Sequence, residues 1–129
     1  MTGAAFVNLP VRDLDAAVGF FTALGFVAAP RPPDARSAQL SFGAATHLVL
    51  HLPDAFAAFA GSAVCDTATA REVIVGLGVD RREQVDALVE RAVAAGGTAL
   101  GPAQDLGYLT MRGFRDPDGH QWSFLHLAG

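Results

Sequence analysis

The sequence has 129 residues, of which 51% are hydrophobic and 17% charged, a balance that favours one compact folded domain and argues against disorder. The formal net charge of −4 provides no basic surface for nucleic acid, and polar residues interrupt every apolar stretch that could span a membrane. The single cysteine, Cys65, cannot form an internal disulfide and agrees with a reducing compartment, so we expect a cytoplasmic protein.

The chain begins with an alternating apolar segment, residues 6–11, that predicts a strand with Asn8 in its middle. A buried amide without a partner costs about 1–3 kcal/mol, so Asn8 raises the question of which group it binds. A helix follows, with Asp13 as its expected N-cap and Gly25 as its end. Three strand-like segments come next, at residues 26–29, 38–42 and 46–52.

The second half of the chain repeats this order after a connecting segment, residues 53–71, that includes a short predicted helix. A strand at 73–79 leads into a helix introduced by the capping-box-like pair Asp80 and Glu83. Further strand-like segments occupy residues 98–100, 108–114 and 121–127, and the turn DPDG joins the last two. The repeat predicts a single α+β domain of two βαβββ modules, about 4–52 and 72–127, in which Asn8 corresponds to Gly76.

Alternation along the strands predicts which side chains share a face. In each module one face is uniformly aliphatic and suits the apolar stripe of a helix. The opposite faces are mixed, and we expect them to line a cavity because helices do not cover such surfaces. These mixed faces carry Asn8, His47, Val49, His51, Gly76 and Gly78.

Two modules of this order, with NLPVRDLDAAVGFFTALGF near the start and FRDPDGHQW near the end, resemble the vicinal oxygen chelate superfamily. That superfamily includes glyoxalase I, extradiol dioxygenases, fosfomycin-resistance enzymes and bleomycin-resistance proteins. The resemblance covers nearly the whole chain and is strongest to small bacterial glyoxalase-like proteins. It implies a curved mixed sheet with a central cup, commonly completed in a homodimer.

The resemblance also implies where a metal would bind, because the metal-using members take one ligand from the first and one from the last strand of each module. Those positions here are Asn8, a residue within His47–His51 for which Val49 is the best match, Gly76 and Ser123, whereas the family usually has His, Gln or Glu. The standard ligand set is therefore missing, and we expect no cofactor. His47 and His51 lie about 13 Å apart on an extended strand, so both cannot readily bind one ion unless the strand bulges. Either could join Asn8 in an atypical divalent-metal site or could be a hydrogen-bonded pocket residue.

A further group of candidate residues lies on one face of the segment 108–114: Tyr108, Thr110, Arg112 and Phe114. If this face lines the cavity, it provides an aromatic wall and a cation for an anionic ligand group. The alternative is that Arg112 pairs with an acidic residue at the surface. Trp122 and His126 fall on the face opposite Ser123, where we expect structural roles.

The leading hypothesis is a small-molecule-binding protein of the glyoxalase/bleomycin-resistance type, with a lyase-, transferase- or dioxygenase-like activity if an unconventional metal binds. The competing hypothesis is a non-catalytic, metal-free protein that sequesters a drug or metabolite, and a third is a scaffold that only dimerises. The expected ligand-binding residues are Asn8, His47, Val49, His51, Gly76, Tyr108, Arg112, Phe114 and Ser123.

Overall fold

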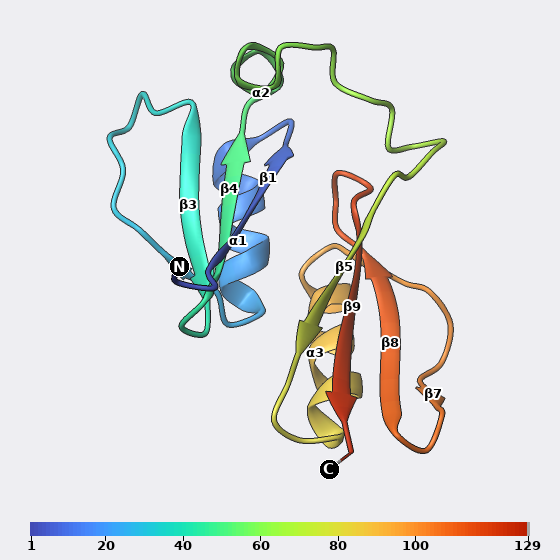
Figure 1. Ribbon diagram of the computed structural model, residues 1–129. Helices are drawn as coiled ribbons and strands as arrows, with labels where there is room; N and C mark the ends of the chain where they lie inside the picture. The colour runs from blue at the N-terminus through green and yellow to red at the C-terminus, as the bar shows by residue number, and fades with distance from the viewer. Residues whose placement is uncertain (129) are drawn as a thin grey trace. The chain divides into compact units, whose positions relative to one another are not determined.

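The computed structural model describes residues 1–128, which form two compact units divided after Cys65. Each unit contains a mixed sheet, and one helix lies along one face of that sheet (Figure 1). In both units the first strand runs parallel to the last, and the other strand pairs are antiparallel. The predicted α+β class and the repeated strand-helix-strand-strand-strand order are confirmed. Within residues 1–128, no helix has the length and apolar character needed to cross a membrane.

The first unit has four strands in the order β1-β4-β3-β2. The parallel pairing of β1 with β4 aligns Asn8 with Val49. A second helix, α2, which we expected in the connecting segment, packs at one end of β1 and β4 and so belongs to this unit (Figure 1). The elements are β1 (Ala5–Pro10), α1 (Leu14–Ala23), β2 (Val27–Ala28), β3 (Ser37–Phe42), β4 (Thr46–His51) and α2 (Pro53–Ala60).

The second unit repeats the arrangement with the order β5-β9-β8-β6, and an additional short strand, β7, pairs with β8. Its parallel pair, β5 with β9, aligns Gly76 with Ser123. The positions that correspond in the two halves of the sequence therefore occupy the same place in the two sheets. The elements are β5 (Ile74–Gly78), α3 (Glu83–Ala94), β6 (Thr98–Ala99), β7 (Gln104–Asp105), β8 (Leu109–Arg115) and β9 (Gln121–Leu127).

The two long helices begin differently. Asp13 caps α1 as predicted, since its carboxylate accepts a hydrogen bond from the Ala16 backbone N–H at 3.0 Å. The expected cap of α3 by Asp80 and Glu83 is wrong. Instead the Gln84 side chain reaches back to accept a bond from the Arg81 backbone N–H at 2.8 Å. In both helices a side-chain oxygen thus accepts a hydrogen bond from a backbone N–H near the helix start.

Each unit buries its own hydrophobic core between the helix and the aliphatic face of the sheet. In the first unit the buried core includes Leu9, Leu14, Ala17, Phe20, Phe21, Leu40, Leu48 and Leu50. In the second unit it includes Leu77, Val85, Val89, Ala92, Phe114, Trp122 and Phe124. The two helices thus cover one face of each sheet and leave the other face for the site described below.

The turn between β8 and β9 is organised by one buried carboxylate, that of Asp116. It accepts hydrogen bonds from the backbone N–H groups of Asp118 and His120, at 2.9 and 3.0 Å, and from Trp122 Nε1 at 3.0 Å. Burial raises the pKa of Asp116, an effect that these bonds and the neighbouring His120 partly offset. Gly119 completes the predicted turn with a φ of 87°, in the left-handed region that favours glycine.

Candidate functional site

The open face of the first sheet brings together four predicted site residues. Parallel pairing of β1 with β4 aligns Asn8 with Val49, and His47 and His51 lie two positions to either side of Val49 along β4. Because alternate residues of a strand point to the same side, these four side chains share the face opposite α1. The sequence-based face assignment is therefore confirmed for this unit.

The Asn8 amide is hydrogen bonded to an imidazole. His51 Nε2 lies 2.9 Å from Asn8 Oδ1, and His51 Nδ1 lies 2.6 Å from the Ser37 hydroxyl oxygen. An amide oxygen only accepts, so Nε2 carries the proton, and Nδ1 accepts from the Ser37 hydroxyl. His51 is only 7% exposed, and its burial lowers its pKa, which favours the neutral ring that this arrangement requires. We call these three residues the Ser37–His51–Asn8 relay.

Aromatic side chains border the relay. The ring of Phe59, on α2, stacks on His51 with a centroid distance of 5.4 Å, and Phe56 meets the same imidazole edge-on at 6.0 Å. Further along the face, Phe6 stacks on His47 at 4.4 Å. Phe59 nevertheless remains 69% exposed, so the face offers apolar area that the chain's first unit leaves uncovered.

His47 adds hydrogen-bonding capacity to this face. Its Nδ1 atom is buried and has no hydrogen-bond partner within residues 1–128. Buried polar atoms in folded proteins normally bond to a protein group, a water molecule or a ligand. The open face of the first sheet therefore combines exposed aromatic area with a polar atom that the protein itself does not satisfy.

The corresponding place in the second unit is less open than predicted. A Cβ atom added at Gly76 would lie 2.9 Å from Leu125 Cδ2, so the leucine side chain fills the space that we expected the glycine to leave. Ser123, the register partner of Gly76, is only 3% exposed. The expectation of free volume at Gly76 is therefore wrong, although a Cβ at Gly78 would meet no atom within 4 Å.

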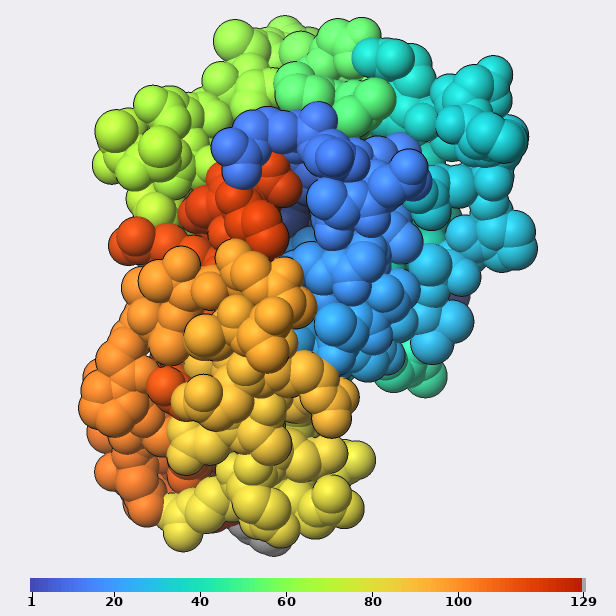
Figure 2. Space-filling model, turned by 180° about the vertical axis from the view of Figure 1, so that it is seen from behind, coloured from blue at the N-terminus to red at the C-terminus, as the bar shows by residue number. Residues whose placement is uncertain are grey.

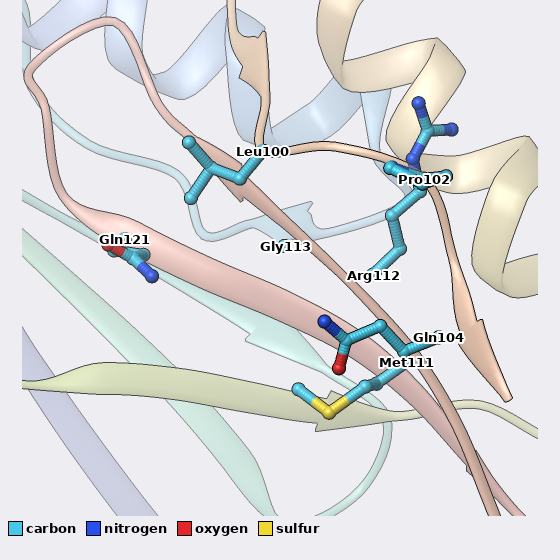
Figure 3. Close-up of a pocket in the computed structure, with 7 residues that line it drawn as sticks. All are labelled: Leu100, Pro102, Gln104, Met111, Arg112, Gly113 and Gln121. Atoms are coloured by element: carbon cyan, nitrogen blue, oxygen red, sulfur yellow. The ribbon is translucent and has the colours of Figure 1, made fainter. Parts of the chain in front are cut away.

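A pocket of about 170 Å³ lies on the second unit instead. Its side chains come from β7, β8, β9 and the segment before β7, and Figure 3 shows Gln104 and Met111 close to each other beside it. Sequence reasoning missed this pocket because it did not identify β7. The lining residues are Leu100, Pro102, Gln104, Met111, Arg112, Gly113 and Gln121.

The predicted cationic wall of Tyr108, Arg112 and Phe114 does not face the open side. Arg112 contributes to the pocket rim, but its guanidinium extends away from Met111 toward α3 (Figure 3). There Nη1 pairs with Asp86 at 3.2 Å and with Glu90 at 2.8 Å, so the interpretation as a residue paired with surface acids is correct. Both acids lie on α3, which forms part of the outer surface of the second unit (Figure 2).

Phe114 and Tyr108 differ from the prediction for separate reasons. Phe114 is fully buried on the α3 side, with Phe124 stacked on it at 5.3 Å. Tyr108 precedes β8 and is 66% exposed. Trp122 is buried in the same core, and His126 Nδ1 lies 3.2 Å from the Val79 carbonyl oxygen, in agreement with the structural roles expected for both.

The donor set does not fit the divalent metal that the resemblance would place here. Of the four corresponding positions, Val49 and Gly76 have no donor atom, and the Asn8 oxygen is already bonded to His51. Divalent metals need several imidazole, thiolate or carboxylate ligands held together. In the part of the chain that the structure describes, no three His, Cys, Asp or Glu side chains gather closely enough to provide them.

Three residues of this site were absent from the prediction. Ser37 begins β3 one residue before the predicted strand, and Phe56 and Phe59 belong to the short helix that we expected in the connecting segment. Their i, i+3 spacing, which places both rings on one side of a helix, was the available signal. What it could not reveal is that this side faces His51.

Comparisons with known proteins give a consistent result. The family model described as Glyoxalase/Bleomycin resistance protein/Dioxygenase superfamily matches residues 3–124. A hypothetical protein from S. aureus is similar at 28% identity and a TM-score of 0.82, covering 98% of this chain and 94% of that one. A glyoxalase-related enzyme from Fulvimarina pelagi matches at 26% identity and a TM-score of 0.80, covering 95% and 86%. No curated protein matches the sequence.

Proposed function

Because the chain belongs to the Glyoxalase/Bleomycin resistance protein/Dioxygenase superfamily, we propose that it binds a small organic molecule on the open face of its first sheet. The observation that carries this proposal is the Ser37–His51–Asn8 relay bordered by Phe56 and Phe59. Ligand sites combine apolar and aromatic walls with a few fixed polar groups, and this face has both.

The chemistry that this face supports is binding through hydrogen bonds and ring contacts. Asn8 supplies a polar group, and the rings of Phe6 and Phe59 supply area on which a flat ligand could stack. A metal-free protein that sequesters a drug or metabolite is therefore the function that we favour. A lyase-, transferase- or dioxygenase-type activity is the alternative, and it would require metal donors that Val49 and Gly76 do not supply.

We expect binding to survive removal of divalent metals. Protein dialysed against EDTA should bind small neutral aromatic molecules, and the largest amide chemical-shift changes in a fragment titration should fall at Asn8, His47 and Phe59. The physical reason is that every contact named above comes from the protein itself. Metal content should be well below one equivalent before dialysis, measured by mass spectrometry of the acid-digested protein.

A matched comparison makes this result decisive. Phe59→Ala removes the exposed ring beside His51 and should weaken binding, whereas Leu106→Ala removes an exposed apolar side chain from the second unit and should not. Stoichiometric zinc, nickel or manganese that is lost in Asn8→Ala would contradict the proposal. So would robust turnover of the lactoylglutathione lyase substrate after nickel or zinc is added.

We also propose that the protein is a cytoplasmic homodimer. Strands β1 and β5 lie at the edges of their sheets, and each carries an exposed large apolar residue, Phe6 or Ile74. Exposed apolar edge strands favour association with another chain. Sedimentation velocity at micromolar concentration should give twice the monomer mass, and Ile74→Lys should shift the equilibrium toward monomer. A monomer at all concentrations would refute the dimer.

A further inference from the structure

The hydrogen bonds of the relay determine which group the Asn8 amide offers to a ligand. The amide can point either its oxygen or its NH₂ group at His51, and the other group then faces outward. In this protein Oδ1 faces His51 Nε2 at 2.9 Å. The NH₂ group consequently points away from the imidazole, and it remains available as a donor of two hydrogen bonds.

The NH₂ group of Asn8 faces open space. Asn8 is half-buried, and its one side-chain hydrogen bond within residues 1–128 is that of Oδ1 to His51. Nδ2 has no hydrogen-bond partner there, and it is not a fully buried atom. The group is therefore reachable, while the oxygen beside it is held by a ring that is almost fully buried.

Ser37 supports the direction of this chain of bonds from its far end. Its hydroxyl lies 2.6 Å from His51 Nδ1. A hydroxyl can donate or accept, whereas the Asn8 oxygen can only accept, so with Oδ1 toward Nε2 the ring proton is on Nε2 and the Ser37 hydroxyl donates to Nδ1. If the proton of His51 were on Nδ1, Nε2 would be a hydrogen-bond acceptor. The Asn8 amide would then have to turn its NH₂ group, and not its oxygen, toward His51. The serine hydroxyl thus acts on the ligand-facing group through two intervening hydrogen bonds, which makes Ser37 and His51 positioning residues.

The relay is bordered by aromatic rings on the α2 side and, on β3, by the exposed polar residue Gln39, which aligns with Val49. Phe56 and Phe59 border His51, and Val49 aligns with Asn8. The nearest charged side chains in sequence, Arg36 and Asp54, pair with each other. A ligand that matches this surface is neutral and flat, with at least one polar group.

We propose that Ser37 and His51 hold the Asn8 amide with its N–H groups toward the ligand, so that the site selects a neutral aromatic molecule with a hydrogen-bond acceptor such as a ketone carbonyl. This inference rests on the proposed function and names its ligand class. It predicts that molecules that accept a hydrogen bond bind more tightly than molecules of similar size and shape that only donate one.

The orientation can be tested without any ligand. Long-range ¹H–¹⁵N correlation spectra distinguish the two neutral tautomers of a histidine ring by the shifts of its nitrogens. We expect His51 to be protonated at Nε2 in the unmodified protein. We expect Ser37→Ala to produce a mixture of tautomers, and Ser37→Thr, which keeps a hydroxyl, to restore the Nε2–H form. An Nδ1–H ring in the unmodified protein would overturn the proposal.

The ligand class is tested with two neutral probes, acetophenone as an acceptor and indole as a donor. Dissociation constants from chemical-shift titration should favour acetophenone, and Ser37→Ala should reduce that preference about fivefold, as expected for loss of one oriented hydrogen bond. Asn8→Asp replaces the NH₂ group with a carboxylate oxygen and should weaken the binding of acetophenone by at least as much. Ser37→Thr should keep the preference for acetophenone over indole.

The outcomes separate this inference from the proposed function. If both probes bind at Phe59 with the same preference in the unmodified protein and in Ser37→Ala, the site is real but the orienting role of Ser37 is refuted. If neither probe shifts Asn8 or Phe59, the proposed function and the ligand class both fail. The tautomer spectra decide the orientation of the amide in either case.

Discussion

Phe114→Ala should lower the free energy of unfolding by about 3–5 kcal/mol, the usual cost of removing a buried aromatic ring from a core. Phe114 is fully buried, and its ring stacks on those of Trp122 and Phe124, with centroid distances of 6.5 and 5.3 Å. Truncation would leave a cavity against α3. Urea denaturation followed by circular dichroism measures the change as a shift in midpoint with an unchanged slope.

Tyr108→Ala provides the matched control. Both residues were predicted to form one aromatic wall, but Tyr108 is 66% exposed, so its removal should change stability by no more than about 0.5 kcal/mol. Comparable losses in the two variants would show that Tyr108 also packs in a core. A Phe114→Ala protein as stable as the unmodified one, with altered ligand binding, would restore the original cavity-wall hypothesis.

Asp116→Ala should destabilise the second unit by about 3 kcal/mol, because the substitution removes a buried acceptor of three hydrogen bonds. Those bonds join the turn to Trp122, which lies in the core. The loss is measurable by urea denaturation, and the tryptophan fluorescence should change in the same transition. Asp118→Ala, at a half-buried position of the same turn, leaves these three bonds to Asp116 in place and should cost less.

The same carboxylate gives a prediction with a definite sign for pH. Burial raises the pKa of Asp116, so the folded protein holds this proton to a higher pH than the unfolded chain does. Its contribution to stability is therefore greatest below the ordinary aspartate pKa and declines as the pH rises through the raised value. The difference in unfolding free energy between the unmodified protein and Asp116→Asn should decrease over that interval. An increase would show that hydrogen bonds to the ionised form outweigh burial.

Most of the fold was predictable because local patterns and long-range pairing agree. Alternation of apolar residues identified the strands that contain Asn8 and Gly76. Asp13 and Gly25 marked the two ends of helix α1, which formed where we expected it. The cap of α3 was misassigned because Gln84, and not the adjacent Glu83, reaches back to a backbone N–H, and the sequence does not rank two neighbouring side chains of equal length. β7 was not predicted because its two residues, Gln104 and Asp105, are polar and exposed and show none of the apolar character of a strand.

The site was only partly predictable because alternation assigns residues to faces without saying which face a helix covers. For Asn8 and His51 the uniformly aliphatic opposite face resolved the ambiguity. For β8 both faces contain apolar residues, and the choice that put Arg112 and Phe114 in a cavity was the wrong one. The bond from Asn8 to His51 depends on a register between strands 43 positions apart, which no local pattern encodes.

The parallel pairing of the first and last strand in each unit also has a kinetic meaning. Residues 11–45 intervene between β1 and β4, and residues 79–120 between β5 and β9, whereas the antiparallel neighbours β3 and β4 are joined by a short turn. Closing a long loop costs chain entropy before any contact compensates for it. We therefore expect the slow step in the folding of each unit to be the pairing of its first strand, β1 or β5, with a hairpin that forms before that strand is in place.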